Sequence, residues 1–144
     1  MAELVREIVI DASPETIFPL ISTTEGWLRW EGTEAEIDAR PGGTYYVNCA
    51  GEYPSRGEFV EVVPNERVVF TFGWDVEGNP IAPGSTTVEI TLEPEGEKTR
   101  LRLLHRDLPE EAAADHGHGW DHYLARLLVV AGGGEVGPDT GPEG

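Results

Sequence analysis

The chain of 144 residues carries 27 acidic side chains against 10 Lys and Arg, a formal net charge of −17. This length fits one domain with a sizeable core. The charge excludes nucleic acid and anionic membrane surfaces as partners, because both would be repelled. No apolar run of membrane-spanning length occurs. The acidity fits either simple solubility or a high-salt habitat, and the composition leaves both open.

The first thirty residues predict one strand followed by two short helices. Residues 4–10 alternate in the manner of a half-buried strand. Ser13 suits a helix N-cap and Pro14 the first helical position, and the buried face of this helix consists of Ile17, Phe18, Leu20 and Ile21. A second short helix starts near Thr23 and carries Trp27, Leu28 and Trp30.

The middle of the chain predicts six more strands with short connections. Polar or Gly/Pro-rich segments separate the apolar, alternating stretches, and we expect a loop or hairpin at 51–57 and a long loop at 75–84. The expected strands are 34–40, 44–49, 59–63, 68–74, 88–92 and 101–105. Consecutive strands with short links predict an antiparallel sheet.

Residues 116–128 predict a long helix with one apolar face, formed by Trp120, Leu124, Leu127 and Leu128. Such a face must be buried, so we expect this helix to lie across the sheet. After Ala131 the chain consists mainly of Gly, Pro and acidic residues. We therefore expect one domain at 1–131 and a disordered tail at 132–144.

Three histidines near the start of this helix raise the question of a metal site. His118 and His122 have the i, i+4 spacing of two ligands on one helix face, with Asp115 nearby. Each lies two residues from Trp120, about 200° around the helix, and so faces solvent, whereas His116 can reach the sheet. We expect neither a metal nor a cofactor, and no nucleophile elbow, phosphate loop or dinucleotide motif is present.

Four stretches resemble the AHSA-like group of the SRPBCC (START-like) superfamily, which is named for the activator of the heat-shock protein 90 ATPase. These are the strand–Pro–helix opening at 8–18, Trp30 at the end of the second helix, and the Pro-Gly-Gly turn at 40–45 with the strand at 57–62. The fourth is the helix pattern of His116, Gly119, Trp120, Leu124 and Leu127. The resemblance implies an α+β helix-grip fold: a curved antiparallel sheet of about seven strands, two short helices after the first strand, and a long C-terminal helix across the sheet.

The resemblance also implies a cavity between the sheet and the C-terminal helix that takes apolar ligands. Its expected lining consists of the inward residues of each element: Trp27, Trp30, Tyr45, Val47, Cys49, Phe70, Phe72, Trp74, Val88, Ile90, Leu103, His105, Trp120, Tyr123 and Leu124. A core filled by these side chains is the alternative.

Three hypotheses of function follow. The first is a non-catalytic protein that binds an apolar small molecule. The second is a cyclase- or hydrolase-like enzyme in which His105 and Glu58 act as acid and base, with Glu58 placed inward by its shared parity with Val60 and Val62. The third is a protein-interaction module, either co-chaperone-like with a role in stress response or a homodimer rather than a monomer. The lone Cys49 and the absence of a leader sequence favour the cytoplasm.

Overall fold

The computed structural model describes residues 2–139 and 141 of the chain. Its strands form one seven-stranded sheet in the order β1-β7-β6-β5-β4-β3-β2, with every neighbouring pair antiparallel. The strands are β1 (Ala2–Ile10), β2 (Glu34–Ile37), β3 (Thr44–Cys49), β4 (Tyr53–Val63), β5 (Arg67–Trp74), β6 (Thr86–Glu95) and β7 (Lys98–Leu108). The part of the expected tail at 140 and 142–144 lies outside the described residues.

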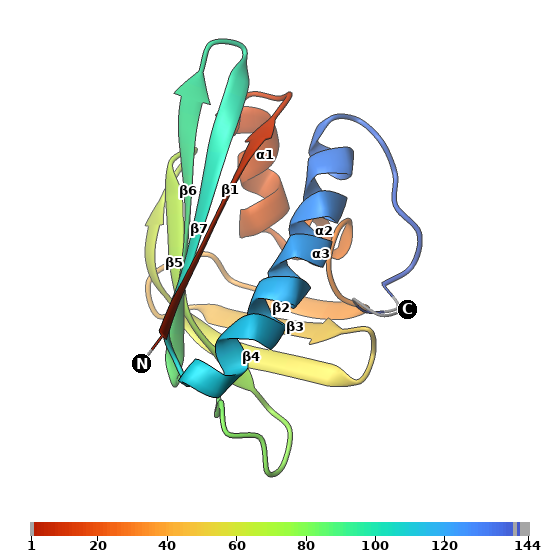
Figure 1. Ribbon diagram of the computed structural model, residues 1–144. Helices are drawn as coiled ribbons and strands as arrows, with labels where there is room; N and C mark the ends of the chain where they lie inside the picture. Colours follow the sequence, from red (N-terminus) through yellow and green to blue (C-terminus); the bar gives the residue numbers. More distant parts are fainter. Residues whose placement is uncertain (1, 140, 142–144) are drawn as a thin grey trace.

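Helices cover one face of this sheet (Figure 1). They are α1 (Pro14–Ser22), α2 (Thr24–Leu28) and α3 (Ala113–Ala131), the last preceded by a short 3-10 turn at Glu110–Ala112. The sheet curves around α3, which crosses it diagonally beside β1 (Figure 1). The predicted α+β helix-grip fold is confirmed. None of the helices in the described residues has the length and apolar content to cross a bilayer.

The two short helices begin where the sequence places their caps. The Ser13 hydroxyl accepts a hydrogen bond from the Thr16 amide, and Pro14 occupies the first turn of α1. The Thr23 hydroxyl accepts from the Gly26 amide at the start of α2. A Cβ on Gly26 would lie 2.0 Å from the Pro19 carbonyl oxygen, so only glycine lets α2 approach α1 this closely.

Aromatic rings fill the space between α2 and the sheet. Tyr45 on β3 stacks on Phe70 of β5 with 4.2 Å between ring centroids. Trp27 of α2 meets both rings edge-on, at 5.6 and 5.7 Å, and Trp30 packs against Trp27 at 5.1 Å. All four side chains are fully buried. Edge-on and offset contacts of this kind are favourable for aromatic rings.

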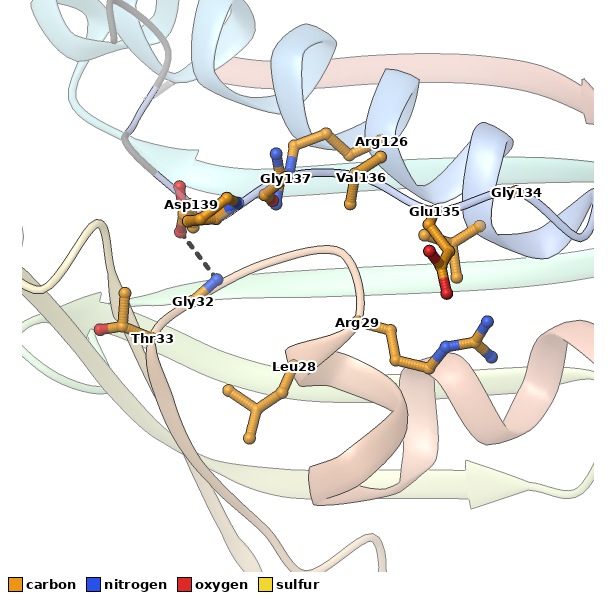
Figure 2. Close-up of a pocket in the computed structure, with 12 residues that line it drawn as sticks. Leu28, Arg29, Gly32, Thr33, Arg126, Gly134, Glu135, Val136, Gly137 and Asp139 are labelled. Atoms are coloured by element: carbon orange, nitrogen blue, oxygen red, sulfur yellow. Dashed lines mark hydrogen bonds between the residues drawn. The ribbon is translucent and has the colours of Figure 1, made fainter.

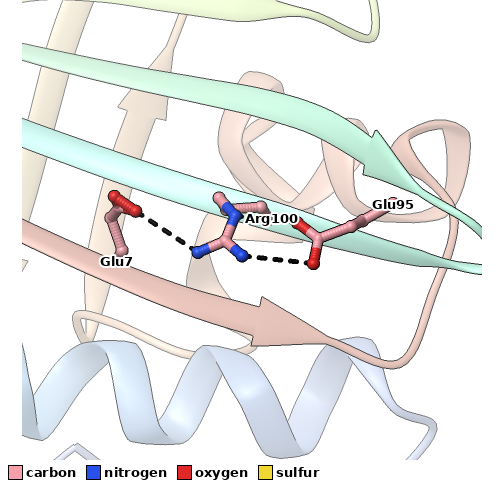
Figure 3. A network of polar contacts seen from close by, with 3 residues as sticks. All are labelled: Glu7, Glu95 and Arg100. Carbon is pink, nitrogen blue, oxygen red and sulfur yellow. Dashed lines mark hydrogen bonds and ion pairs between the residues drawn. The ribbon is translucent and has the colours of Figure 1, made fainter.

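The opposite face of the sheet is polar and carries cross-strand ion pairs. Arg100 of β7 lies between its two neighbouring strands and contacts Glu95 of β6 and Glu7 of β1 (Figure 3). Two nitrogens of the guanidinium contact the two Glu95 oxygens at 2.7 and 3.1 Å. Exposed pairs of this kind add little to stability, so the fold depends mainly on the inner face.

The expected apolar face of α3 needs one correction. Trp120, Leu124 and Leu127 are buried, but Leu128 is 40% exposed. Tyr123, Val130 and Ala131 share the buried face instead, because α3 packs against both β1 and α1 and this shifts the contact line away from Leu128. Gly117 lies at the closest approach, where a Cβ would come 2.7 Å from Nη2 of Arg6 and 3.3 Å from Cδ1 of Leu4.

Truncating Trp120 tests the direction in which α3 faces. Trp120 is 5% exposed, and its indole nitrogen donates to His105. We expect Trp120→Ala to lower the free energy of unfolding by about 3–5 kcal/mol, because it opens a cavity under the helix. His118 is exposed, so His118→Ala should change stability by less than about 0.5 kcal/mol. Urea unfolding of the two variants measures the difference, and equal losses would show that α3 faces another way.

Candidate functional site

The structure places the predicted cavity-lining residues in the core. Fourteen of the fifteen side chains are buried, and Trp74 is half-buried. They contact one another as a packed cluster. Two hollows at the surface are lined by other residues. The inward direction of these residues was therefore predicted correctly from strand parity, whereas a ligand space between them stays a prediction.

Two histidines, His105 on β7 and His116 near the start of α3, lie close together. His105 of β7 is fully buried; its Nε2 lies 2.8 Å from the Thr86 hydroxyl, and its Nδ1 accepts from the Trp120 indole at 3.1 Å. The Thr86 hydroxyl donates to the Phe72 carbonyl, so Nε2 of His105 carries the proton. Burial, and then the neighbouring His116, lower the pKa of His105 to about 3. His105 is a neutral group with both ring nitrogens occupied.

His116 faces the sheet, as predicted. Its Nε2 accepts a hydrogen bond from the Trp74 indole at 3.1 Å, and its ring lies 5.2 Å from that of His105. Burial lowers the pKa of His116, partly offset by the charge of Asp115. His118 is exposed. Among residues 2–139 and 141, no group of three or more His, Cys, Asp or Glu side chains is arranged to hold a metal ion.

The expected inward position of Glu58 is wrong. Glu58 is exposed, and its neighbour Phe59 is fully buried. The pairing of β4 with β5 shifts register between Phe59 and Glu61. A β-bulge inserts one extra residue, so Val62 packs on the core after the bulge while Phe59 does so before it. Because Glu58 points to solvent and His105 is enclosed, the two cannot form the acid–base pair of the enzyme hypothesis.

A second polar cluster lies where α2 ends. Glu31 is only 5% exposed, and its carboxyl oxygens accept from the Trp27 indole at 3.1 Å and from the Cys49 thiol at 3.4 Å. Burial raises the pKa of Glu31 to about 7, and the charge of Asp139 adds to the rise, although the two hydrogen bonds lower the pKa. Burial and the nearby Glu31 also raise the pKa of Cys49 well above its ordinary value. Cys49 is thus a protonated, unreactive thiol.

Asp139, in the segment after α3, fits into this cluster and is 6% exposed. One of its oxygens accepts from the amides of Gly32 at 2.7 Å and Ala50 at 3.0 Å. The other accepts from the Tyr123 hydroxyl at 2.9 Å and the Gly141 amide at 3.0 Å. Burial opposes ionisation, but hydrogen bonds from Ala50, Tyr123, Gly32 and Gly141 outweigh it and hold the pKa of Asp139 below its usual range.

The segment that carries Asp139 forms one wall of a surface groove of about 620 Å³. Leu28 and Arg29 of α2 and its C-terminal flank face it from one side, and the segment 134–139 lies across from them (Figure 2). Arg126 of α3 connects the walls, since it donates to the carbonyls of Trp30 and Gly137, each at 2.8 Å. The segment 134–139 lies within the tail expected to be disordered, and that expectation stays a prediction.

The sequence did not single out Glu31, Asp139 or Arg126 as site residues. Glu31 follows Trp27 by four positions, a spacing that could have drawn attention to a pair near the end of α2. No local signal marks Asp139, because its partners come from three distant parts of the chain. The groove as a whole therefore became visible only in the folded chain.

Comparison with protein families shows to which family the chain belongs. Residues 11–132 match the family described as "Activator of Hsp90 ATPase homolog 1-like protein". The chain belongs to this family. A search among curated proteins finds no match. The predicted resemblance to the AHSA-like group is confirmed.

Solved structures of other AHSA1-like and related proteins agree. An AHSA1-like protein from Rhizobium etli is 47% identical, with 96% of this chain and 86% of that chain covered and a TM-score of 0.75. The Aha1 dimer from Colwellia psychrerythraea is 22% identical, covering 93% and 100%, with a TM-score of 0.79. An HSP90 activator from Plasmodium falciparum is 21% identical, covering 92% of this chain and 97% of that chain, with a TM-score of 0.74. The last two show the fold alone, and the monomer or homodimer expected for this chain stays a prediction.

The buried carboxyl of Glu31 predicts a pH dependence for this AHSA1-like protein. Its pKa rises from an ordinary 4.5 to about 7 on folding, so the folded state holds the proton more tightly. Stability from this group is full below pH 4.5 and falls by about 3 kcal/mol as the pH rises through 7. Denaturant unfolding of the wild type and Glu31→Gln across this range measures the difference between them. A constant difference would contradict the assignment.

His105 predicts a pH dependence of stability with the opposite sign in the same AHSA1-like core. Its pKa falls from 6.5 to about 3 on folding, so the unfolded state binds the proton first. Stability is lost as the pH falls below 6.5, by about 5 kcal/mol at pH 3. We expect His105→Asn to reduce this acid loss, while the contributions of His116 and Asp139, whose pKa values are also lowered, remain. The comparison is made in the Glu31→Gln background, so that the rising and falling contributions do not cancel. An acid loss of unchanged size after the substitution would exclude His105 as a source.

Proposed function

We propose that this AHSA1-like domain binds a small molecule with an apolar body in the groove between α2, α3 and the segment 134–139. The observation that carries the proposal is the groove itself. Its volume of about 620 Å³ lies within the range of small-molecule sites, about 300–1,000 Å³. The interior between the sheet and α3 is packed with the rings of Trp27, Tyr45 and Phe70, so we place the ligand in the groove rather than among them.

The lining of the groove combines an apolar part with cations. Leu28, Val130 and Val136 supply the apolar surface, and Arg29 and Arg126 supply positive charge. Val130 belongs to the buried core and Val136 packs against it, so the groove borders the interior directly. A ligand with an apolar body and one polar or anionic end matches this arrangement. Glu135 and Asp139 also line the groove, so the two arginines balance these acids locally in a protein whose net charge is −17.

Two exposed leucines provide a matched test. Leu28 lines the groove and is 39% exposed, whereas Leu128 on α3 is 40% exposed and does not line it. We expect Leu28→Trp to fill the groove and to weaken binding of a neutral apolar dye, Nile red, by at least about tenfold. Leu128→Trp should leave the affinity unchanged. Fluorescence titration measures both, and native mass spectrometry of freshly purified protein shows whether a ligand is retained.

The two variants also exclude a nonspecific effect. Both add an indole to a half-exposed helical position, so a general gain in surface hydrophobicity would affect them alike. Equal loss in both variants would contradict the groove as the site. The same would follow from a wild-type protein that neither binds the dye nor retains any small molecule.

A further inference from the structure

We propose that the groove ends in a carboxylate-binding site that the protein's own Asp139 now occupies, and that this site takes the acid group of an organic acid with an apolar body. The inference rests on the proposed function for the apolar body of the ligand and adds the recognition of its charged end. Asp139 then acts as an intramolecular occupant that a ligand acid must replace.

Three of the four donors that hold Asp139 belong to the folded domain, and the fourth, the Gly141 amide, belongs to the segment that carries it. The Gly32 amide lies between α2 and β2, the Ala50 amide lies in the β3–β4 turn, and the Tyr123 hydroxyl comes from α3. They converge on the two oxygens of one carboxylate over 2.7–3.0 Å. A set of converging donors from distant segments is an anion site, whether the anion is a side chain or a ligand.

These donors stay in place without Asp139. Gly32 has a φ of 90°, and a Cβ there would lie 2.6 Å from Cγ1 of Val47, so the backbone is packed against β3. Ala50 has a φ of 56° at the end of that strand. Tyr123 is 5% exposed and belongs to the core cluster. The site is therefore built by the sheet and α3 before any carboxylate enters.

The chemistry of the site favours a carboxylate over a neutral group. The three domain groups all donate, and buried donors without an acceptor are costly. Arg126 and Arg29 add positive charge along the groove, and Glu135 adds a negative charge there. Burial keeps Glu31 protonated below about pH 7, so Glu31 does not repel an incoming anion at lower pH. An alcohol of the same length could fill the groove but could accept fewer of these hydrogen bonds.

The segment that carries Asp139 is suited to release. Between Gly132 and Asp139 its apolar side chains are limited to Val136 and Pro138, and Val136 is only partly buried. Besides the contacts of Asp139, Arg126 holds the segment to the domain by a hydrogen bond to the Gly137 carbonyl. Ligand affinity is reduced by the fraction of molecules in which the segment is docked, so weakening the docking should raise affinity.

Asp139→Asn tests the exchange. The amide cannot satisfy all the converging donors, so the segment should detach while the donors remain. At about pH 6 octanoate is ionised and Glu31 is mostly protonated. We expect Asp139→Asn to bind octanoate at least about tenfold more tightly than the wild type. It should bind 1-octanol no more tightly than the wild type, because release of the segment also removes Val136 from the groove wall. Adding Tyr123→Phe should weaken octanoate binding again by about fivefold. Isothermal titration calorimetry measures these constants.

A carboxylate-to-amide change elsewhere controls for net charge. Glu97→Gln, in the exposed β6–β7 turn, removes the same charge and should leave both affinities at wild-type values. Amide NMR spectra supply a readout that does not need the variant. In the wild type, octanoate should leave the Gly32 and Ala50 amides hydrogen-bonded, while the amides of the segment 134–139 shift because that segment leaves the groove.

The outcomes separate the two proposals. If Asp139→Asn binds octanoate no more tightly than the wild type, or if Glu97→Gln gains as much, the carboxylate site is wrong. Binding of 1-octanol that Leu28→Trp abolishes would then still support the proposed function. If neither octanol nor octanoate binds to the wild type or to Asp139→Asn, both proposals fail. Amides of the segment 134–139 that do not shift on saturation with octanoate likewise overturn the exchange.

Discussion

The fold depends on covering one apolar face of the sheet. Seven strands present their inward residues to the same side, and α3 must cross that side closely enough to exclude water. Gly117 makes this possible, because any larger residue would meet Leu4 and Arg6 on β1. Once α3 packs on the sheet, the Trp120 indole reaches His105 and, three residues later, the Tyr123 hydroxyl reaches Asp139. Both polar clusters thus follow from the same packing contact.

The two clusters differ in what they can exchange. His105 is enclosed by Thr86 and Trp120, and each partner belongs to the rigid sheet or to α3. Replacing a partner there would mean opening the core. Asp139 instead belongs to a short segment at the surface, while its donors belong to the domain. Only the second cluster has a partner that can leave without disturbing the packing, which is why the proposals concentrate on that cluster.

Much of the fold could be predicted from the sequence, since it follows from short-range patterns. Strand alternation, the Ser13 and Thr23 caps and the stripe around Trp120 all depend on residues a few positions apart. The errors arose where a distant contact changed a local pattern. The bulge near Val60 reversed the parity that placed Glu58 inward. The position of α3 between β1 and α1 exposed Leu128. The site residue Asp139 has partners more than a hundred positions away, and no local pattern encodes them.

The hydrogen bonds of the four tryptophans have a practical consequence. The four indole N–H groups have three kinds of acceptor: a carboxyl at Glu31 for Trp27, a backbone carbonyl at Leu20 for Trp30, and the imidazoles of His116 and His105 for Trp74 and Trp120. The chemical shift of an indole proton follows the strength of the bond that it makes. The chain therefore contains four native spectroscopic probes, two at the histidines, one at the buried acid and one at the junction of α1 and α2.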